Sequence, residues 1–308
     1  MRTNCYIRLC MTLVIGLPLS ACCAYAETVN CTPITSVPYV ISSSGVYCLV
    51  SDIVTAMTSG NAIEIQSNSV TIDLNGHKLG GAAAGLATQA IGIYALNRSN
   101  TTIMNGTIRG FQRGVYLQDA SNNWSNSSGS VVKDLRVDLS TNAGIIVEGR
   151  GNVIKDNFIT NTGGSTVSLH AFSVLSKGAG ARVINNDIVG TATTVLYNDA
   201  KGISVYWGKG AIIENNRVTN TTSPTGTAYG IHVEESGASS VIANHVSNDE
   251  IAQYAVGIFV GGANSNVRDN TISNVQYGLY TNGAKYMGNM VSGATTAYTG
   301  GTAGTGNM

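Results

Sequence analysis

The chain has 308 residues, 17 basic and 17 acidic side chains, and only 11% charged residues. Zero net charge argues against a nucleic-acid binder, and a hydrophobic content of 43% argues against a disordered chain. The 37 glycines, and surface positions occupied by Asn, Ser and Thr instead of strong helix formers, favour an all-β, turn-rich protein over an α-helical one.

The N-terminus has the pattern of an export signal, which we expect to span residues 1–26. Arg2 and Arg8 supply a positive start, and residues 9–19 are mostly apolar but too short to cross a bilayer. Ala24-Tyr25-Ala26 then provides a small-x-small cleavage site. We therefore expect a secreted or periplasmic protein without a transmembrane segment.

An alternative processing route stays open at the same end of the chain. Leu19-Ser20-Ala21-Cys22 is similar to a bacterial lipobox, which would make Cys22 a lipidated anchor. We prefer cleavage after Ala26, because a lipoprotein usually carries a polar tether after its cysteine.

Cleavage after Ala26 removes four of the six cysteines and leaves Cys31 and Cys48. An exported protein meets an oxidising compartment, so we predict a disulfide between these two. A metal site is the weaker interpretation, because no histidine is nearby. The bridge would contribute ~3 kcal/mol.

The body of the chain repeats a short unit. One part of it is a Gly-hydrophobic pair, at Gly92-Ile93, Gly114-Val115, Gly144-Ile145, Gly202-Ile203, Gly230-Ile231, Gly257-Ile258 and Gly278-Leu279. Another begins with Asn, at Asn157, Asn186, Asn216, Asn244, Asn270 and Asn289, and ends four residues later in Asn or Gly. A third hydrophobic pair, such as Val183-Ile184, lies between them. Each unit thus predicts three short strands with tight turns.

Three short strands cannot bury their inner faces alone, but stacked units can. The repeat therefore predicts a right-handed parallel β-helix, a solenoid of about nine coils over residues 61–293. We expect residues 27–60 to form an N-terminal cap that contains the disulfide, and residues 294–308 to form a C-terminal cover or tail.

The unit resembles that of the right-handed parallel β-helix proteins of the pectate-lyase-like superfamily. The residues that carry the resemblance, beside the repeat, are Cys31-Thr32-Pro33-Ile34, Tyr47-Cys48-Leu49 and the run from Val70 to His77. It covers about residues 31–308 and resembles exported bacterial members. It implies the fold, whereas the activity stays open because this repeat occurs in enzymes, in adhesins and in proteins of no known activity.

The recurrent asparagines are expected to be structural. Asn tolerates the left-handed backbone of a tight turn, and asparagines stacked in register can pass amide hydrogen bonds from coil to coil.

Insertions are predicted at one turn of the coils and at one other place. Those at the common turn comprise residues 162–169, 191–198, 221–228 and 249–253, and a further insertion, 119–130, follows the first strand of coil 3. Loops gathered on one edge can form the wall of a groove. The alternative is that surface loops vary freely in length and sequence without a function.

Outward residues of the Gly-containing strand form a predicted exposed stripe. They are Tyr94, Tyr116, Ile146, Ser204, His232, Phe259 and Tyr280, with Gln118, Glu148, Tyr206 and Glu234 in a second row. Aromatic side chains on a flat sheet suit stacking against sugar rings, but aromatic residues also simply favour strands. We expect Tyr206 and Trp207 to be the stacking pair.

A basic ladder is predicted beside that strand, formed by Arg150, Lys177 and Lys209, one per coil. Stacked like charges repel, so an anionic group of a ligand could relieve them. The alternative is pairing with Glu148, Glu234 or Glu235.

Proton transfer, if there is any, is assigned to His232 with Glu234, and Lys209 is a further candidate base. Glu148 and Glu234 lie on non-adjacent coils, roughly 10–15 Å apart, which does not suit an ordinary glycosidase pair. Motifs of the β-helix polygalacturonases and of the classical pectate lyases are missing, as are a nucleophilic serine pattern, a P-loop and a Cys/His cluster. We predict no cofactor and no metal site; calcium is compatible with the fold but has no motif.

Three functional hypotheses remain. The first is an exported β-helix protein that contacts a polysaccharide along one face, with catalysis unproven. The second is a lyase or epimerase of an acidic, uronate-containing glycan, which needs a base near the C5 proton and a cation for the carboxylate. The third is a non-catalytic adhesin or scaffold.

Overall fold

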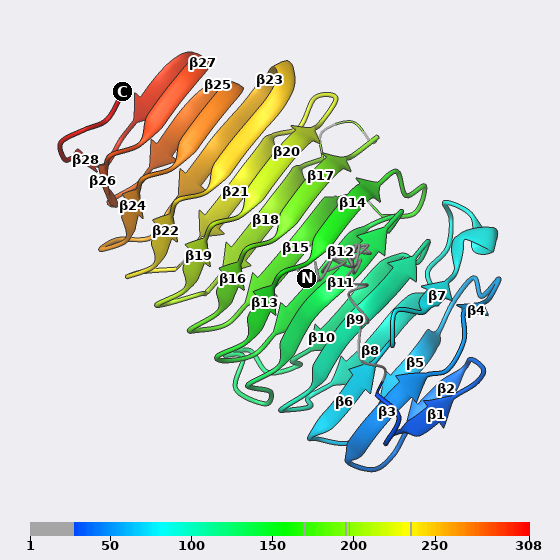
Figure 1. The fold of residues 1–308 in the computed structure, drawn as a ribbon. Coiled ribbons are helices and arrows are strands. Elements are labelled where there is room, and N and C mark those ends of the chain that lie inside the picture. The colour runs from blue at the N-terminus through cyan, green and yellow to red at the C-terminus, as the bar shows by residue number, and fades with distance from the viewer. Residues whose placement is uncertain (1–27, 169, 195, 197, 235) are drawn as a thin grey trace, which may run out of the picture.

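The computed structural model describes residues 28–308 apart from 169, 195, 197 and 235, and in residues 251–253 the backbone alone. The predicted signal peptide and Cys22 lie outside the described residues. The described chain forms one parallel β-solenoid (Figure 1), which confirms the predicted all-β parallel architecture. Its helical content is a single 3-10 turn, η1 (Ala82–Ala84). None of the described helices is long and apolar enough to cross a membrane.

The strands stack in three columns, each strand pairing in parallel with its counterpart one coil along. The first column contains β2 (Tyr39–Ile41), β5 (Asn61–Ile65), β8 (Ile91–Leu96), β10 (Arg113–Gln118), β12 (Ala143–Glu148), β15 (Ala171–Lys177), β18 (Ala200–Tyr206), β21 (Ala228–Glu234) and the C-terminal parts of β23 (His245–Val260), β25 (Thr271–Thr281) and β27 (Met290–Thr299).

The second column contains β1 (Thr32–Ile34), β3 (Gly45–Leu49), β6 (Val70–Asp73), the N-terminal parts of β9 (Thr102–Arg109) and β11 (Val131–Asp138), and then β13 (Val153–Lys155), β16 (Arg182–Ile184), β19 (Ile212–Glu214), β22 (Ser240–Ile242), β24 (Asn266–Arg268), β26 (Lys285–Met287) and β28 (Thr302–Ala303). The third contains β4 (Ile53–Val54), β7 (Lys78–Gly80), the C-terminal parts of β9 and β11, β14 (Phe158–Gly163), β17 (Asp187–Ala192), β20 (Arg217–Thr222) and the N-terminal parts of β23, β25 and β27.

Coils are numbered here from the first-column strand that opens each, so that coil 1 begins with β5 and coil 9 with β25. The first column completes eight turns between β5 and β25, and the rest of β25 with β26 and β27 adds a further one. This agrees with the prediction of about nine coils.

Inward side chains of the first column form a continuous aliphatic stack. Its members, each at most 1% exposed, are Ile63, Ile93, Val115, Ile145, Val174, Ile203, Ile231, Ile258 and Leu279. Each such burial is worth about 1.5–3 kcal/mol, so the stacked core holds the coils in register.

A glycine precedes seven of these nine aliphatic residues, and Ala62 precedes Ile63 in coil 1. The glycine is required by a close approach of two coils. A Cβ at Gly230 would lie 2.7 Å from the carbonyl oxygen of Gly257 in the next coil, closer than a carbon can approach. Coil 5, where the glycine is missing from the sequence, has the small Ser173 at this position, fully buried and bonded to the Thr191 hydroxyl at 2.6 Å.

The predicted asparagine ladder is confirmed. The Nδ2 of Asn157, Asn186, Asn216, Asn244 and Asn270 each donates to the Oδ1 of the next asparagine along the solenoid at 2.9–3.0 Å, and Asn289 is the last partner of that series. The expected backbone conformation was wrong by one position, since the left-handed residue is the one before, such as Asn185 or Asn215. The ladder residues themselves point inward and are almost fully buried.

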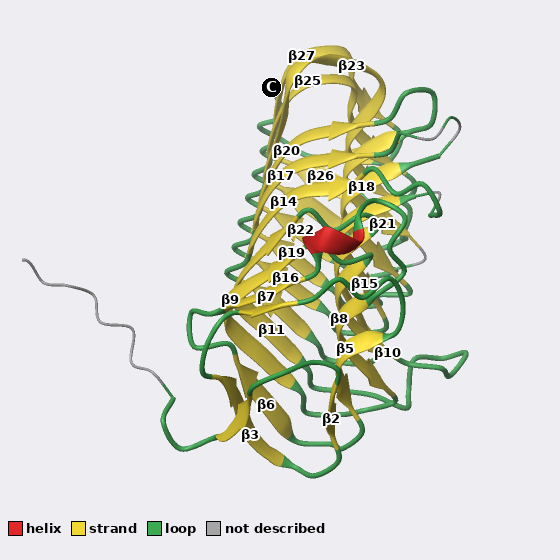
Figure 2. Cartoon of the chain, turned by 90° about the vertical axis from the view of Figure 1, so that its right-hand side faces the viewer, coloured by secondary structure: helices red, strands yellow, loops and turns green. Residues whose placement is uncertain are grey.

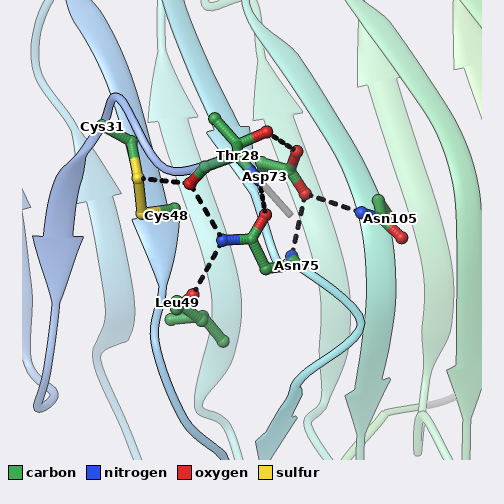
Figure 3. Close-up of a disulfide and its surroundings, with 7 residues drawn as sticks. All are labelled: Thr28, Cys31, Cys48, Leu49, Asp73, Asn75 and Asn105. Carbon is green, nitrogen blue, oxygen red and sulfur yellow. Dashed lines mark hydrogen bonds between the residues drawn. A yellow bond between two sulfur atoms is a disulfide. The ribbon is translucent and has the colours of Figure 1, made fainter. Parts of the chain in front are cut away.

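At the N-terminal end, strands β1 to β4 continue the three columns instead of forming a separate layer. The predicted disulfide, Cys31–Cys48, is present there with its Cα atoms 5.8 Å apart (Figure 3). Beside it, the Asp73 carboxylate accepts hydrogen bonds from the Thr28 hydroxyl and from the Asn105 amide. The predicted cap region therefore belongs to the same stack of strands.

At the C-terminal end, β27 extends beyond residue 293, and the chain then folds back over the last coil. The Asn289 amide donates to Asn307, and the Tyr298 hydroxyl donates to the Met308 carbonyl. Tyr286 and Tyr298 stack with their ring centroids 5.4 Å apart. Residues 294–308 thus comprise the rest of an edge strand and a short cover.

Candidate functional site

The candidate site lies on the outward side of the first column between β10 and β25, which we call the site face. Loops project from the edge of the solenoid that carries β10, β15, β18 and β21 (Figure 2). The outward residues predicted as the exposed stripe form the middle row of this face and lie in register from coil to coil. Leu175 occupies the equivalent position in coil 5.

The predicted exposure of that row is wrong for its centre. Ile146, Ser204 and His232 are at most 6% exposed. The reason is that large side chains of the two flanking rows pack over them. Phe172 and Tyr206, for example, pack against an outer hydrophobic cluster that contains Ile146 and is separate from the solenoid core.

Lys177 forms an ion pair instead of a rung in a basic ladder. Its Nζ lies 2.7 Å from Oε1 of Glu148, its neighbour one coil back, and Glu148 is only 4% exposed. The other carboxylate oxygen of Glu148 accepts the backbone N–H of Asp119 at 3.1 Å. The alternative of pairing with Glu148 is thus confirmed for Lys177.

Arg150 and Lys209 lie in turns beyond the strands, and both are exposed. Backbone hydrogen bonds place Ala179 between them in the stack, because Gly151 pairs with Ala179 and Gly180 with Lys209. Lys177 belongs to a different row. The predicted ladder of three cations is therefore not formed, because the first-column strands and the turns after them place these residues in two rows.

The insertion at 119–130 is folded by a buried carboxylate. Asp119, 2% exposed, accepts hydrogen bonds from the backbone N–H groups of Ser121 and Ser127 and from both serine hydroxyls. These bonds hold the pKa of Asp119 below its ordinary value despite its burial. The loop therefore has a defined shape that positions Trp124 over the site face.

The chain has two tryptophans, and the fold brings them together. The ring of Trp124, in the coil 3 insertion, lies 5.3 Å from that of Trp207, directly after β18 in coil 6. Tyr206 lies 5.6 Å from Trp207, and Lys177 Nζ lies 5.2 Å from the ring of Trp124. Both tryptophans have positive φ, 56° and 51°. Such backbone is costly for a bulky residue and often marks a functional position.

Two adjoining hollows open on this part of the face. One, of about 410 Å³, is lined by the insertion loop and Trp124, and the other, of about 350 Å³, by Arg113, Phe172 and His170. Tyr116, Glu148 and Lys177 line both. The ion pair therefore forms the shared floor of a groove with aromatic walls.

Tyr206 interacts with a buried lysine. Lys201, 7% exposed, donates to the Tyr206 hydroxyl at 2.7 Å and pairs with Asp199 at 3.4 Å, and its ammonium lies 5.3–5.8 Å from the rings of Phe172, Tyr206 and Tyr229. Burial disfavours the charge, but the bonds to Tyr206 and Asp199 outweigh it and raise the pKa of Lys201. Tyr206 is therefore half-buried and fixed, not free on the surface.

His232 and Glu234 are brought together as predicted, with Nε2 and Oε2 3.4 Å apart. His232 lies among aromatic rings and stacks on Phe259 at a centroid distance of 5.0 Å. Its burial, helped by the Lys201 charge, lowers the pKa of His232 to about 3. Burial outweighs Glu234 here, because that carboxylate side chain is 45% exposed and screened by solvent. His232 is accordingly a neutral and weakly basic imidazole.

Glu148 and Glu234 are too far apart for a glycosidase pair. Lys177 and Tyr206 separate them in the row, so three strand spacings give ~14 Å, whereas such carboxylates lie about 5–9.5 Å apart. Within the described part of the chain, no three His, Cys, Asp or Glu residues are placed to hold a metal ion.

Three of the four insertions predicted at the common turn begin with the last two residues of β14, β17 and β20, and most of their other described residues lie in the loops that follow. The fourth does not, since residues 249–253 continue the backbone of β23, with register shifts between Ser247 and Val256. Among the described residues of these insertions, Trp124 of the coil 3 insertion supplies the aromatic side chain of the groove described above.

Sequence reasoning missed three residues of the site, namely Trp124, Lys201 and Arg113. Lys201 and Arg113 precede the Gly-hydrophobic pair, whose hydrophobic residue points inward, so a strict period of two would have placed both of them inward. The alternation breaks at the glycine, which the sequence pattern did not reveal. The Arg113 guanidinium lies 4.9 Å from the Tyr116 ring and forms no ion pair with any described residue. Trp124 carries no periodic signal, because it lies in an insertion.

Comparison with known proteins shows what the chain is similar to. A family model described as a right-handed beta helix region matches residues 123–295. No curated protein was found that matches the chain.

Three solved structures are similar to the chain. The mannuronan C-5 epimerase AlgE6 A-module of Azotobacter vinelandii matches with a TM-score of 0.53 at 14% identity, over 88% of this chain and 82% of that one. DFA-IIIase from Arthrobacter chlorophenolicus A6 matches with a TM-score of 0.49 at 13% identity, over 82% and 71%. The catalytic domain of a GH87 α-1,3-glucanase in complex with nigerose matches with a TM-score of 0.47 at 12% identity, over 89% and 62%. At 14% identity the likeness to the AlgE6 A-module is one of fold alone.

Proposed function

The chain belongs to the right-handed β-helix family, and from that premise we propose that its site face binds a polysaccharide. The observation that carries the proposal is the meeting of both tryptophans with Tyr206 beside the buried Glu148–Lys177 pair. Flat aromatic rings stack on the apolar faces of sugars, and charged groups bond to their hydroxyls. Export, as expected from residues 1–26, would bring the protein to polysaccharides outside the cytoplasm.

The ligand chemistry that fits best includes acidic sugars. Arg113 is half-buried, lines the smaller of the two hollows and lacks a carboxylate partner among the described residues. A cation in that position would gain from the carboxylate of a uronate, whereas Lys177 is already neutralised by Glu148. Arg150 and Lys209 remain candidates only for contacts at the rim.

Binding without turnover is favoured over a lyase or epimerase activity. A base for the C5 proton needs a pKa near the working pH, but the pKa of His232 is about 3. Glu234 is the more accessible of the predicted pair, since its side chain is 45% exposed. His232, Glu234 and Lys209 stay a prediction for catalysis, and an adhesin or scaffold role is compatible with binding.

The test joins a glycan array to an ultraviolet absorbance assay for unsaturated uronate products. We expect retention of acidic glycans without such products. Retention with product formation would instead support the lyase, and a blank array would contradict the proposed function.

Trp207→Ala is the variant that tests the face. The side chain is 45% exposed, so its loss should leave folding intact while weakening glycan binding by ~1–3 kcal/mol, or roughly 5- to 150-fold. Phe158→Ala, on the third column, is the matched control and should leave affinity unchanged. Tyr206→Phe should weaken binding less than Trp207→Ala, because it removes only the hydroxyl that Lys201 holds. Equal affinity of Trp207→Ala and wild type would place the ligand elsewhere.

A further inference from the structure

In the part of the chain that the structure describes, exposed Trp and Tyr side chains are confined to one side of the solenoid. Among the described residues, four aromatic side chains are exposed, and all belong to the first column or directly precede or follow it in the chain: Trp207, Tyr254, Tyr277 and Tyr280. The second and third columns present none that is exposed. Exposed aromatic surface gathered on one face marks an interaction site.

Three of these four lie together, away from the groove with the tryptophans. Tyr254, Tyr277 and Tyr280 line a hollow of about 430 Å³ in coils 7 to 9, together with Tyr229 and Phe259. Phe259 links the cluster, with ring centroids 5.4 Å from Tyr280 and 6.0 Å from Tyr229. The other lining residues are Thr227, Val256, Gln276 and Thr299, so no charged side chain lines this hollow.

The two parts of the face are continuous. Tyr116 in the tryptophan groove and Tyr280 in the tyrosine hollow belong to the same outward row, six strand spacings apart, or ~29 Å. Between them Lys201, Ser204 and His232 are at most 7% exposed, so tightly packed side chains close the surface. A ligand that leaves one hollow along the solenoid axis therefore meets the other on the same floor.

We propose that the tyrosine hollow is a second sugar-binding subsite, which takes the uncharged faces of sugar rings by stacking. The ligand is then an extended polysaccharide of about six or more sugars, since roughly one sugar fits each strand spacing of about 4.8 Å. This inference rests on the proposed function and adds to it the length of the ligand and its course along the axis. A short oligosaccharide reaches only one subsite, whereas a long one reaches both.

The experiment compares chain lengths. Trisaccharide and octasaccharide fractions of oligogalacturonate, oligomannuronate and cello-oligosaccharide are titrated calorimetrically into wild type, Trp207→Ala and the double variant Tyr277→Ala/Tyr280→Ala. We expect that, in one of the three series, wild type binds the octasaccharide at least tenfold more tightly than the trisaccharide of the same series. The double variant should lose that advantage and keep the trisaccharide affinity, whereas Trp207→Ala should weaken the binding of both.

The outcomes separate the two proposals. A double variant that keeps the octasaccharide advantage overturns the second subsite and leaves the proposed function standing. An unaltered affinity in Trp207→Ala, or no binding of any fraction to wild type, overturns the proposed function and this inference with it. If the tyrosine hollow instead binds a protein partner, the double variant should show the same dependence of glycan affinity on chain length as wild type. Tyr277→Leu/Tyr280→Leu, which keeps apolar volume but loses the flat rings, guards against a folding defect and should behave as the alanine pair does.

Discussion

Burial decides the chemistry of the polar side chains on the site face. His232, Lys201 and Glu148 point outward in register, yet they are only 4–7% exposed. A different interaction or protonation state offsets the cost of burying each polar group. Glu148 has a counter-ion, Lys201 has Tyr206 and Asp199, and His232 is neutral. A neutral imidazole among rings is stable only while it stays unprotonated.

The pH dependence of folding should report on His232. Its pKa is lowered to about 3 in the folded protein from 6.5, so the unfolded chain binds the proton first as the pH falls. Stability is therefore complete above the unfolded pKa and is lost progressively below it, by about 2 kcal/mol between pH 7.5 and pH 5. His232→Phe should remove this part of the loss in urea melts at the two pH values. His245→Gln, at an exposed position, is the control and should behave as wild type; the same pH dependence in His232→Phe would contradict the assigned pKa.

Two successive asparagines of one turn have different structural roles. In coil 6, Asn215 is exposed with φ 54°, so it makes the turn, whereas Asn216 is 1% exposed and points inward. Asn216 donates to the Val183 carbonyl and to Asn244, and its oxygen accepts from the backbone and side chain of Asn186. The turn thus joins three adjacent coils through one side chain.

Asn216→Ala should destabilise the protein by about 2–4 kcal/mol, because it leaves several buried donors and acceptors of the neighbouring coils without partners. Asn215→Gly, one residue away, is the matched control and should cost less than about 0.5 kcal/mol, since glycine accepts a positive φ. Chemical denaturation measures both. Equal losses of stability in the two variants would refute the assignment of different structural roles to Asn215 and Asn216.

At the scale of the whole molecule, each coil contacts its neighbours along the axis, so stability is distributed as in a one-dimensional stack. The ends therefore open more easily than the middle. Cys31 and Cys48 join β3 to the segment just before β1, and Thr28 adds bonds to Asp73 and Asn75 in the next coil.

Cys31→Ser/Cys48→Ser should loosen the N-terminal end first. The bridge restrains a short loop and is worth ~3 kcal/mol, which local opening of β1 to β6 would lose. Hydrogen exchange followed by mass spectrometry should show faster exchange in residues 32–73 and unchanged exchange in β15 to β21. Wild type with its disulfide intact provides the reference rates, and a uniform acceleration along the solenoid would count against the prediction.

What the sequence alone determined is whatever repeats. The Gly-hydrophobic pairs, the ladder asparagines and the cysteine pair imply the solenoid, its three strands per coil, its register and its disulfide, because stacking places equivalent positions one above another. The tertiary structure decided what does not repeat. It brought Trp124 from an insertion to Trp207 three coils away, paired Lys177 with Glu148, and buried His232 under its flanking rows. These contacts depend on side-chain size and loop shape, for which a periodic pattern holds no information.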